Sequence, residues 1–413
     1  MPPYRPPLGT KLPGLASHDL VVLGGGVMGR FTAYHAAEQG ARVVILERGR
    51  VGDPMTASYG RTRSFRNDYL DTGYARLAHE AFRLWGEFES RTGTEVLVRC
   101  GGMNIAKRSV TPDFASTYAE RSYAVLQEVG LESQALDGDE LRRRFPFLDA
   151  DIGRLDVDAG VVNLPAVTET LTRVLGERGV QTVEGVETTA VERDGEALRV
   201  ITDAGEFVTR SLVVTAGHGT NALLARLPGC ELQVPLTKDR PSEAKYVTPP
   251  ADARERFTAG AMPVIAYLDT GIYCHPIVGG LTEAVKIGYY NPPDMPRGTT
   301  SIDSIASFIE QCMPGLADAE MRDVEDVDQC DYDLVADDDF VLGAVPGVAD
   351  AFVGVGWRGT GYKFAPWVGS VLAGLALGHG TNDDIDRFDP ARFLKGGSSD
   401  GPSVTADPAA ATR

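Results

Sequence analysis

The chain has 413 residues, enough for two or three domains with sizeable cores, and its 43% hydrophobic and 24% charged content is ordinary for a globular protein. A formal net charge of -18 disfavours nucleic acid and anionic membrane surfaces as partners, and no stretch is long and apolar enough to predict a membrane span. The five cysteines are scattered and never form a C-x-x-C pair, which disfavours a disulfide framework and a metal centre. The N-terminus carries several prolines and no apolar run typical of a secretory signal, so we expect a cytoplasmic protein.

Residues 19–48 read as strand, glycine turn, helix and strand. Gly24, Gly26 and Gly29 supply the G-x-G-x-x-G spacing, in which glycines permit a tight turn, close approach of a pyrophosphate and close helix packing. Glu47 ends the second strand, where its carboxylate can accept hydrogen bonds from ribose hydroxyls. The stretch predicts a site for an adenine dinucleotide; the alternative is a strand–helix–strand unit without a ligand.

A long polar connection, residues 51–69, follows and carries three arginines. Loops of this length often carry function. If the segment is helical after Ser58, Arg63 and Arg66 lie on one face and can point at one anionic group; the alternative is two solvated arginines. Apolar residues at helical spacing then predict an amphipathic helix over 74–89.

The middle of the chain alternates helices and strands. Helices are predicted over 111–129 and within 160–179, followed by strands between 180 and 214. The last of these strands runs into Ala216-Gly217-His218-Gly219, a second place where backbone can approach a ligand closely. His218 fits a turn residue better than a metal ligand, because no second histidine stands at ligand spacing.

The C-terminal half is expected to be richer in strands. Residues 232–290 are strand-like throughout, and a helix is predicted over 302–312. A buried strand at 351–355 enters the glycine-rich turn 356–361. The last helix is predicted over 363–377, directly after these glycines, so its N-terminus can face a ligand.

Three polar segments are interpreted as lying outside the cores. Residues 1–18 are expected to form an extended arm because prolines prevent a regular helix, with the ordered fold beginning at Asp19. Residues 337–339 are interpreted as a solvated acidic loop. Residues 396–413 have the composition of a disordered tail.

These motifs occur in the order and at the separations of a known family. The chain resembles the D-amino-acid-oxidase-type FAD oxidoreductases, in particular the branch of monomeric sarcosine oxidase, N-methyltryptophan oxidase and pipecolate oxidase. The resemblance covers about residues 19–393. Besides the glycine stretch with Glu47, it is carried by five further segments, at 60–66, 271–273, 285–289, 330–332 and 359–364.

The resemblance implies an α/β (α+β) fold: a two-domain flavoprotein with a Rossmann-like FAD-binding domain and a substrate domain built on a large mixed β-sheet. The FAD-binding domain would be discontinuous and comprise residues 19–94, 158–227 and 333–395. Residues 95–157 and 228–332 would form the substrate domain.

The resemblance also implies FAD as the cofactor. Cys330 matches the cysteine that bonds covalently to the flavin in that branch, whereas a lone cysteine in a strand is more often an inert buried thiol. Arg63 matches an arginine beside the flavin, where positive charge favours the reduced, anionic ring. The other residues expected at the cofactor are Gly24, Gly26, Gly29, Glu47, Arg48, Ser58, Ala216, Gly217, Gly359, Gly361 and Lys363.

The same resemblance assigns the catalytic residues. Arg66 and Lys363 match the two cations that hold a substrate carboxylate and would orient an amino acid toward the flavin. Lys286 matches a lysine linked to oxygen activation, because a fixed ammonium stabilises the negative charge that develops as O2 is reduced; the alternative is a lysine on the solvent face of a strand. Tyr273 is expected over the flavin with Lys286, and Trp357 beside the flavin.

Departures from the family's pattern concern the substrate. Tyr59, Tyr290 and Thr360 stand where sarcosine oxidases commonly carry histidines, and Trp357-Arg358 replaces a smaller pair. We expect a reshaped pocket, with Trp357 stacking on a ring or closing over the substrate. Arg358 would add a third cation or pair with a surface acid.

The predicted function is oxidation of the C–N bond of a secondary amino acid (N-methyl or cyclic), or of a related biosynthetic intermediate, to an imine, with O2 reduced to H2O2. The alternative is a flavin-dependent amino-acid dehydrogenase that uses another electron acceptor. The expected partners are a small amino-acid-like substrate with a carboxylate and O2, and the expected state is a monomer.

Overall fold

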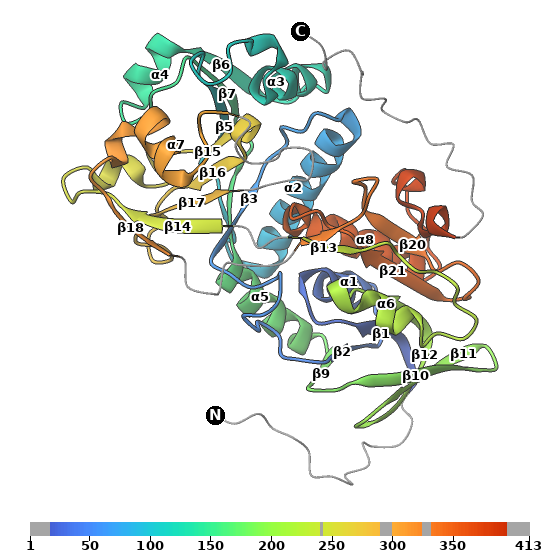
Figure 1. Ribbon diagram of the computed structural model, residues 1–413. Helices are drawn as coiled ribbons and strands as arrows, with labels where there is room; N and C mark the ends of the chain where they lie inside the picture. The colour runs from blue at the N-terminus through green and yellow to red at the C-terminus, as the bar shows by residue number, and fades with distance from the viewer. Residues whose placement is uncertain (1–16, 240–242, 290–299, 324–331, 395–413) are drawn as a thin grey trace.

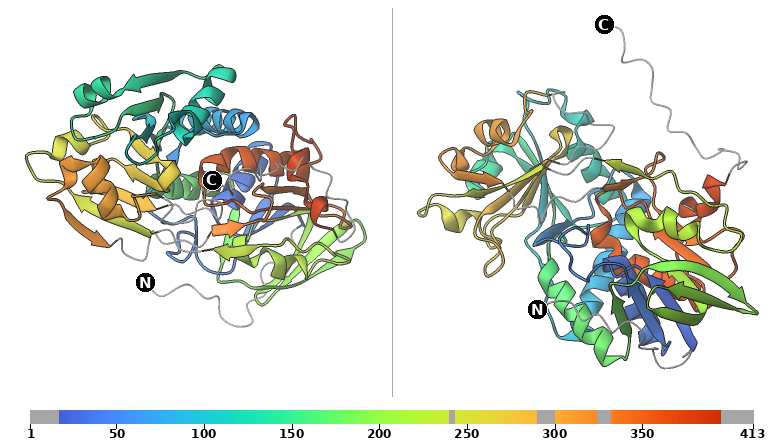
Figure 2. Two further views of the ribbon diagram at one scale, coloured as in Figure 1. Left: turned by 45° about the horizontal axis from the view of Figure 1, so that its top comes forward. Right: turned by 60° about the horizontal axis from the view of Figure 1, so that its bottom comes forward.

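The computed structural model describes residues 17–239, 243–289, 300–323 and 332–394, which form two lobes (Figure 1). The right-hand view of Figure 2 shows the lobes side by side. Cys330, Tyr290, the arm before Ser17 and the C-terminal tail lie outside the described residues. The expected mixture of helices with large mixed sheets is confirmed, and among the described residues every helix is too short or too polar to cross a bilayer.

The first lobe is built on an eight-stranded sheet. Its order is β10 (Thr188–Asp194), β11 (Ala197–Thr202), β12 (Gly205–Val214), β1 (Ser17–Leu23), β2 (Val43–Glu47) and β9 (Gln181–Glu184), with β21 (Ala351–Val355) beside β12 and β20 (Val341–Ala344) beside β21. β1 is central and parallel to both neighbours, and its pairing begins at Ser17, slightly before the predicted Asp19. Leu20 and Val22 belong to one hydrophobic core and Val21 and Leu23 to another, as the alternation of a strand covered on both faces requires.

Helices cover one face of this sheet: α1 (Val27–Glu38), α2 (Thr72–Thr92), α5 (Leu164–Glu177) and α8 (Ala365–Ala376). The rings of Phe31 and Trp85 meet edge to face with centroids 5.0 Å apart, and Phe31 and Phe88 do so at 5.1 Å. The short helix α6 (Thr220–Leu224) contributes to the core on the other face. The aromatic contacts fix α1 against α2, and thereby fix the helix N-terminus at the carboxyl end of β1.

The second lobe has its own hydrophobic core and its own eight-stranded sheet. Three helices accompany this sheet: α3 (Tyr118–Glu128), α4 (Gly138–Arg144) and α7 (Ile305–Cys312). All of its strand pairs are antiparallel except β15 with β5. The strand order is β18 (Glu320–Asp323), β14 (Glu243–Thr248), β17 (Val285–Tyr289), β16 (Ile272–His275), β15 (Val264–Tyr267), β5 (Gly102–Ala106), β7 (Ile152–Asp156) and β6 (Ser133–Asp137).

Two small sheets complete the fold. One has the order β3 (Thr62–Phe65), β8 (Gly160–Asn163) and β4 (Leu97–Val98), and the other pairs β13 (Thr237–Asp239) with β19 (Tyr332–Leu334). In Figure 1, β3 lies between the two lobes. The exact residue boundaries expected for the two domains stay a prediction.

The helix predicted within 160–179 is found there, whereas two other predicted helices begin later than expected. The region 160–179 opens with strand β8, and α5 starts only after Asn163, whose side chain caps it. α3 likewise covers only the second part of the helix predicted over 111–129. The helix predicted over 363–377 starts at Ala365, so Lys363 lies in the preceding 3-10 turn.

Candidate active site

The glycine turn between β1 and α1 fits very closely against its neighbours. Gly24 has a φ of 112°, a conformation that residues with a side chain rarely adopt. A Cβ on Gly29 would lie 2.1 Å from the carbonyl oxygen of Gly24 and 2.7 Å from Thr215 Oγ1, so α1 can approach this turn only with glycine there. Ser58 Oγ accepts a hydrogen bond from Val27 N at 2.9 Å and so caps α1 from a distant segment.

Glu47 lies at the end of β2, as predicted. Its Oε2 accepts from Gly25 N at 2.6 Å and its Oε1 accepts from Gly49 N at 2.6 Å. The carboxylate therefore ties the glycine turn to the loop after β2. Each oxygen retains further acceptor capacity, and Glu47 also lines the adjoining cavity, so it can still accept from a ribose.

A cavity of about 390 Å³ extends from this turn toward the 356–363 segment. This volume lies in the usual range of a small-molecule or cofactor site. Of the residues predicted at the cofactor, Gly29 does not line the cavity and Cys330 lies outside the described residues. The residues predicted at the cofactor that line the cavity are Gly24, Gly26, Glu47, Arg48, Ser58, Arg63, Ala216, Gly217, Gly359, Gly361 and Lys363.

Glycines also shape the far end of this cavity. A Cβ on Gly359 would lie 2.6 Å from ring atoms of Tyr332, and one on Gly361 would lie 2.4 Å from Trp357 Cβ. These glycines therefore let Tyr332 and Trp357 pack closely against the backbone, so that glycines line the cavity at both ends. His218 lies in a 3-10 turn at the rim, as predicted, and within the described ranges no group of three metal-ligating side chains occurs.

Arg30, in the first turns of α1, is a site residue that was not predicted from the sequence. Its Nη2 donates to Thr168 O at 3.0 Å and to Thr172 Oγ1 at 2.6 Å. With Gly26 and Ser58 it borders a smaller cavity of about 20 Å³ beside the N-terminus of α1. Burial lowers the pKa of its guanidinium to about 10, which leaves it charged at neutral pH. Arg30 therefore adds fixed positive charge where the motif expects phosphates.

Arg63 and Arg66 do not share a helical face, because the segment that carries them forms strand β3 and its continuation. Arg63 lines the cavity, and its Nη2 donates to Tyr59 O at 2.8 Å. Arg66 turns toward Asp68: its Nη1 donates to Asp68 Oδ1 at 2.6 Å and to Asp68 O at 2.9 Å. With 16% of its side chain exposed, Arg66 is not a solvated arginine either.

Arg66 and Lys363 meet at the ring of Tyr69. Arg66 Cζ lies 4.9 Å and Lys363 Nζ 5.6 Å from the ring centroid. Lys363 Nζ donates to Tyr69 OH at 3.0 Å, to Thr360 O at 3.0 Å and to Thr360 Oγ1 at 2.6 Å. The two cations predicted to hold a carboxylate are thus brought together, around a tyrosine that was not predicted.

Lys363 is a buried ammonium, 6% exposed, and no carboxylate of the described residues forms a salt bridge with it. Burial holds its pKa well below the ordinary value. The positive charges of Arg66 and Arg358 act in the same direction, and the negative charge of Asp68 opposes them. An arriving anion would offset both the burial and the repulsion, so this end of the cavity favours a negatively charged ligand.

Lys286 lies on β17 of the second lobe and is 2% exposed, so the alternative of a solvent-facing lysine is wrong. Its neighbour across the strand pair is His275, whose Nδ1 is hydrogen-bonded to Thr62 Oγ1 of β3 at 2.8 Å. The Tyr273 ring covers Gly288, where a Cβ would lie 2.2 Å from Tyr273 Cζ. Strand β16, which carries Tyr273 and pairs with the strand of Lys286, is therefore joined to β3, which carries Arg63.

Trp357 lines the cavity, but its indole packs into the first lobe. The ring meets Phe340 edge to face at a centroid distance of 5.3 Å and covers Gly354, where a Cβ would lie 3.2 Å from Trp357 Cζ2. These contacts hold the indole in place. Stacking of Trp357 on a ring or over a substrate stays a prediction.

Arg358 and the acidic segment 337–339 form ion pairs. Arg358 has a φ of 55° and pairs with Asp338, the second of the two roles considered for it. Asp337 pairs with Arg392 at 2.7 Å and Asp339 with Arg387 at 2.8 Å. The segment is a loop, as predicted, and the side chains of Asp337 and Asp338 are 39% and 49% exposed, but each of its three carboxylates is paired with an arginine.

The fold and the site together define a class. Proteins that bind a dinucleotide cofactor share three features of this lobe: a glycine turn at the end of a central parallel strand, an acid on the next strand and a cavity that begins at the glycine turn. Lys363 at the far end of the cavity, with Arg66 beside it at Tyr69, adds a place for an anionic ligand. The class is therefore a dinucleotide-dependent enzyme, built here with a separate second lobe.

Comparison with known proteins narrows this class. The model of the DAO family, described as FAD dependent oxidoreductase, matches residues 19–375, and the chain belongs to this family. Human peroxisomal sarcosine oxidase is 27% identical over 392 residues, covering 91% of this chain and 96% of that protein. N-methyl-L-tryptophan oxidase of Yersinia pestis is 26% identical over 394 residues, covering 91% and 99%. The structure of L-proline dehydrogenase from P. horikoshii, at 19% identity, has a TM-score of 0.75 over 92% of this chain and 99% of that chain, which supports the fold.

Proposed function

We propose that this FAD-dependent oxidoreductase oxidises the C–N bond of a secondary amino acid, N-methyl or cyclic, or of a related biosynthetic intermediate, to an imine, with O2 reduced to H2O2. The observation that carries the proposal is the meeting of Arg66 and Lys363 at Tyr69 beside the cavity. The names of the relatives, sarcosine oxidase and N-methyl-L-tryptophan oxidase, support N-methyl amino acids as the substrate class.

The geometry of the two cations suits a carboxylate. Every hydrogen bond that Arg66 makes to the described residues runs through Nη1, which leaves Nε and Nη2 for a bidentate contact. Lys363 adds a second charge from the cavity wall. Binding a carboxylate at this point would fix the position of the attached amine, and the same cations would lower the pKa of that amine and leave its lone pair free for oxidation.

FAD, when bound, supplies the acceptor for the two electrons of the amine. The chain would hold it with the glycine turn, Glu47, Ser58 and Arg30, whose positions are consistent with a diphosphate beside the N-terminus of α1. Lys286 would provide a fixed, poorly hydrated ammonium for the negative charge that develops on O2.

Turnover with a panel of amino acids and a peroxide readout tests the reaction. Lys286→Met should slow reoxidation by O2 far more than it slows reduction of the flavin by substrate, whereas Lys107→Met, an ion-paired lysine of the same lobe, should change neither. Equal slowing of both half-reactions would remove the role given to Lys286. Turnover that requires an artificial acceptor and yields no peroxide would favour the dehydrogenase alternative.

Covalent attachment of the flavin through Cys330 is a further part of the proposal. Tyr332 and Asp333, which follow Cys330 closely in the chain, line the cavity, and this supports an attachment point there. After acid precipitation the yellow colour should stay with the protein pellet. Intact flavin in the supernatant would contradict the attachment.

We also propose that the enzyme acts as a monomer. Among the described residues, the large hydrophobic side chains with substantial exposure are Met55, Leu70 and Met321, which leaves little apolar surface for a permanent interface. Sedimentation at micromolar concentration should give the mass of one chain. The cytoplasmic location stays a prediction.

A further inference from the structure

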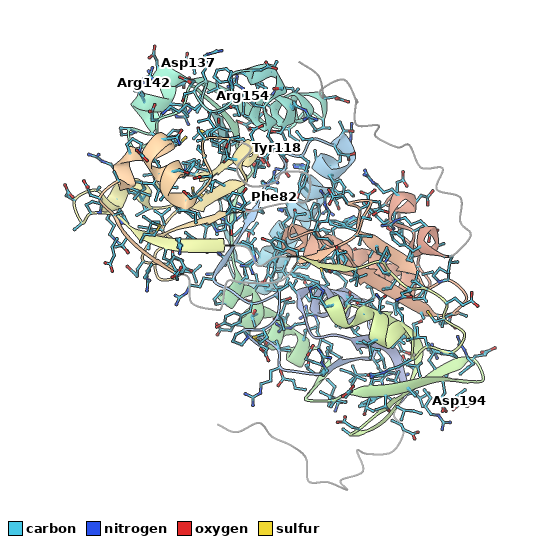
Figure 3. All side chains as sticks on the ribbon, viewed as in Figure 1. Phe82, Tyr118, Asp137, Arg142, Arg154 and Asp194 are labelled. Carbon is cyan, nitrogen blue, oxygen red and sulfur yellow. The ribbon has the colours of Figure 1, made fainter. Side chains whose placement is uncertain are left out.

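Asp68 is buried, with 4% of the residue exposed, and its carboxylate forms an ion pair with one nitrogen of Arg66. Arg66 Nη1 donates to Asp68 Oδ1 at 2.6 Å, to Asp68 O at 2.9 Å and to Tyr118 OH at 3.2 Å. Tyr118 OH in turn donates to Asp68 O at 2.9 Å. Tyr118 is the first residue of α3 and is labelled in Figure 3. One end of the guanidinium is therefore fully bonded by protein groups.

Asp68 is itself held by the second lobe. Its Oδ2 accepts a hydrogen bond from Asn104 Nδ2 on β5. The preceding residue, Asn67, donates to Asp156 of the adjacent strand β7 twice, from its backbone N at 2.6 Å and from Nδ2 at 3.2 Å. The segment that carries Arg66 is thus fastened to two neighbouring strands of one lobe, while Arg66 itself faces Lys363 of the other.

We propose that Asp68, together with Tyr118, is a positioning residue for the substrate carboxylate: it holds Arg66 by Nη1, so that the rest of the guanidinium faces the site, and it offsets the repulsion between Arg66 and Lys363. Asp68 does not touch the substrate in this arrangement. The inference rests on the proposed function, because it assumes a carboxylate ligand at these two cations.

The charges around Lys363 determine what loss of Asp68 does. Arg66 and Arg358 lower the pKa of Lys363 and Asp68 raises it, while Arg358 is itself paired with Asp338. Asp156 contributes less negative charge, because burial and the charge of Asp68 raise its own pKa. Without the carboxylate of Asp68, Lys363 loses its proton at a lower pH, and the ligand then faces one cation instead of two.

The test is a titration of the flavin-loaded enzyme with acetate, and then with the amino acid of the panel that is turned over best, followed by flavin absorbance from pH 6 to pH 10. In Asp68→Asn the alkaline limit of binding should move down by about one pH unit or more, the size of a close charge interaction. The matched control is Asp71→Asn, three residues further along, whose carboxylate caps α2 and pairs with Arg387 and touches neither cation. The pH dependence of carboxylate binding in Asp71→Asn should equal that of the wild type. An unshifted alkaline limit in Asp68→Asn would overturn the proposal that the charge of Asp68 supports Lys363.

Tyr118→Phe provides a second variant should Asp68→Asn fail to fold. It removes one contact of Arg66 Nη1 and changes no charge, so affinity for the carboxylate should fall several-fold at every pH without a shift of the alkaline limit. Unchanged affinity would overturn the positioning role. The test distinguishes failure of the proposed function from failure of this inference. A wild-type enzyme that binds no carboxylate and oxidises no amino acid would refute the proposed function. Wild-type behaviour of both variants would refute only the role given to Asp68 and Tyr118.

Discussion

Replacing Lys363 by methionine should separate the function of this site from its contribution to stability. Methionine approximates the length of lysine without its charge. The ammonium is buried, with 6% of the residue exposed, and its hydrogen bonds go to Tyr69 and Thr360 and not to a carboxylate of the described residues. The positive charge of Lys363 therefore favours binding of a carboxylate but disfavours folding.

The expected magnitudes follow from these contacts. Loss of a charge-assisted contact to the substrate carboxylate costs about 1.5 to 3 kcal/mol, so kcat/KM should fall about 10- to 150-fold. For folding, the pKa of Lys363 is lowered in the folded state, so the folded protein binds fewer protons than the unfolded chain between the two pKa values and stability rises with pH there. Because burial disfavours the charged form of Lys363, its replacement by methionine should raise the free energy of unfolding at pH 7 by about 1 to 3 kcal/mol. Tyr69 OH and Thr360 Oγ1, 2.6 Å apart, can still bond each other in the variant.

The assay compares urea unfolding of the flavin-loaded proteins, without substrate, at pH 7 and at pH 9. The advantage of Lys363→Met should shrink at the higher pH as the wild type gains stability. Lys107→Met is the control, because Lys107 has a carboxylate partner in Asp149 at 2.6 Å and lies away from the cavity. It should keep full activity and gain no stability. A Lys363→Met protein that is less stable than the wild type at pH 7 would refute the reasoning, since it would mean that neighbouring groups stabilise the ammonium.

Two further predictions concern the cofactor cavity. Gly29→Ala should bind less flavin and lose more than about 2 kcal/mol of unfolding free energy. The new Cβ would lie 2.1 Å from the backbone oxygen of Gly24, and the backbone there cannot move away without disrupting the turn. Gly86→Ala, in α2 with open space around it, should instead gain about 0.5 to 1 kcal/mol, and an equal effect of both substitutions in urea unfolding would contradict the packing argument. Burial raises the pKa of Asp333 from 3.8 to about 6, so the folded protein binds more protons than the unfolded chain in this window and stability falls as pH rises through it. In Asp333→Asn the loss of stability between pH 4 and pH 7 should be smaller by about 3 kcal/mol. The same pH dependence of the urea midpoint in both proteins would disprove this prediction.

Local sequence was sufficient for the cofactor end of the site. The glycine turn, Glu47 and the strands around them follow from spacing and hydrophobic alternation within 30 residues, and each lies where the motif required. The amphipathic helix expected over 74–89 is α2, because its period of apolar residues reflects a single buried face.

The substrate end depends on contacts between distant segments. Tyr69 bonds Lys363 across 294 residues, and nothing in the local sequence marks either as a partner of the other. The arginine segment forms strand β3 because β8, about a hundred residues later, pairs with it, and this pairing overrides the weak local preference for a helix. The ion pairs of the acidic segment 337–339 were missed for the same reason: its arginine partners lie 20 to 55 residues further along the chain.

The whole protein and its site act differently on the forms of an amino acid in solution. A net charge of -18 repels an anion at long range, but a zwitterion has no net charge to repel. The form that arrives is therefore the zwitterion, whose alkylammonium group ordinarily keeps its proton at neutral pH. If its carboxylate is held by Arg66 and Lys363, as proposed, their positive charges and the loss of water would favour departure of that proton. The two cations would thus bind the substrate carboxylate and also lower the pKa of the substrate amine. The negative charge of Asp68 partly offsets their positive charge, and would therefore determine the size of both effects.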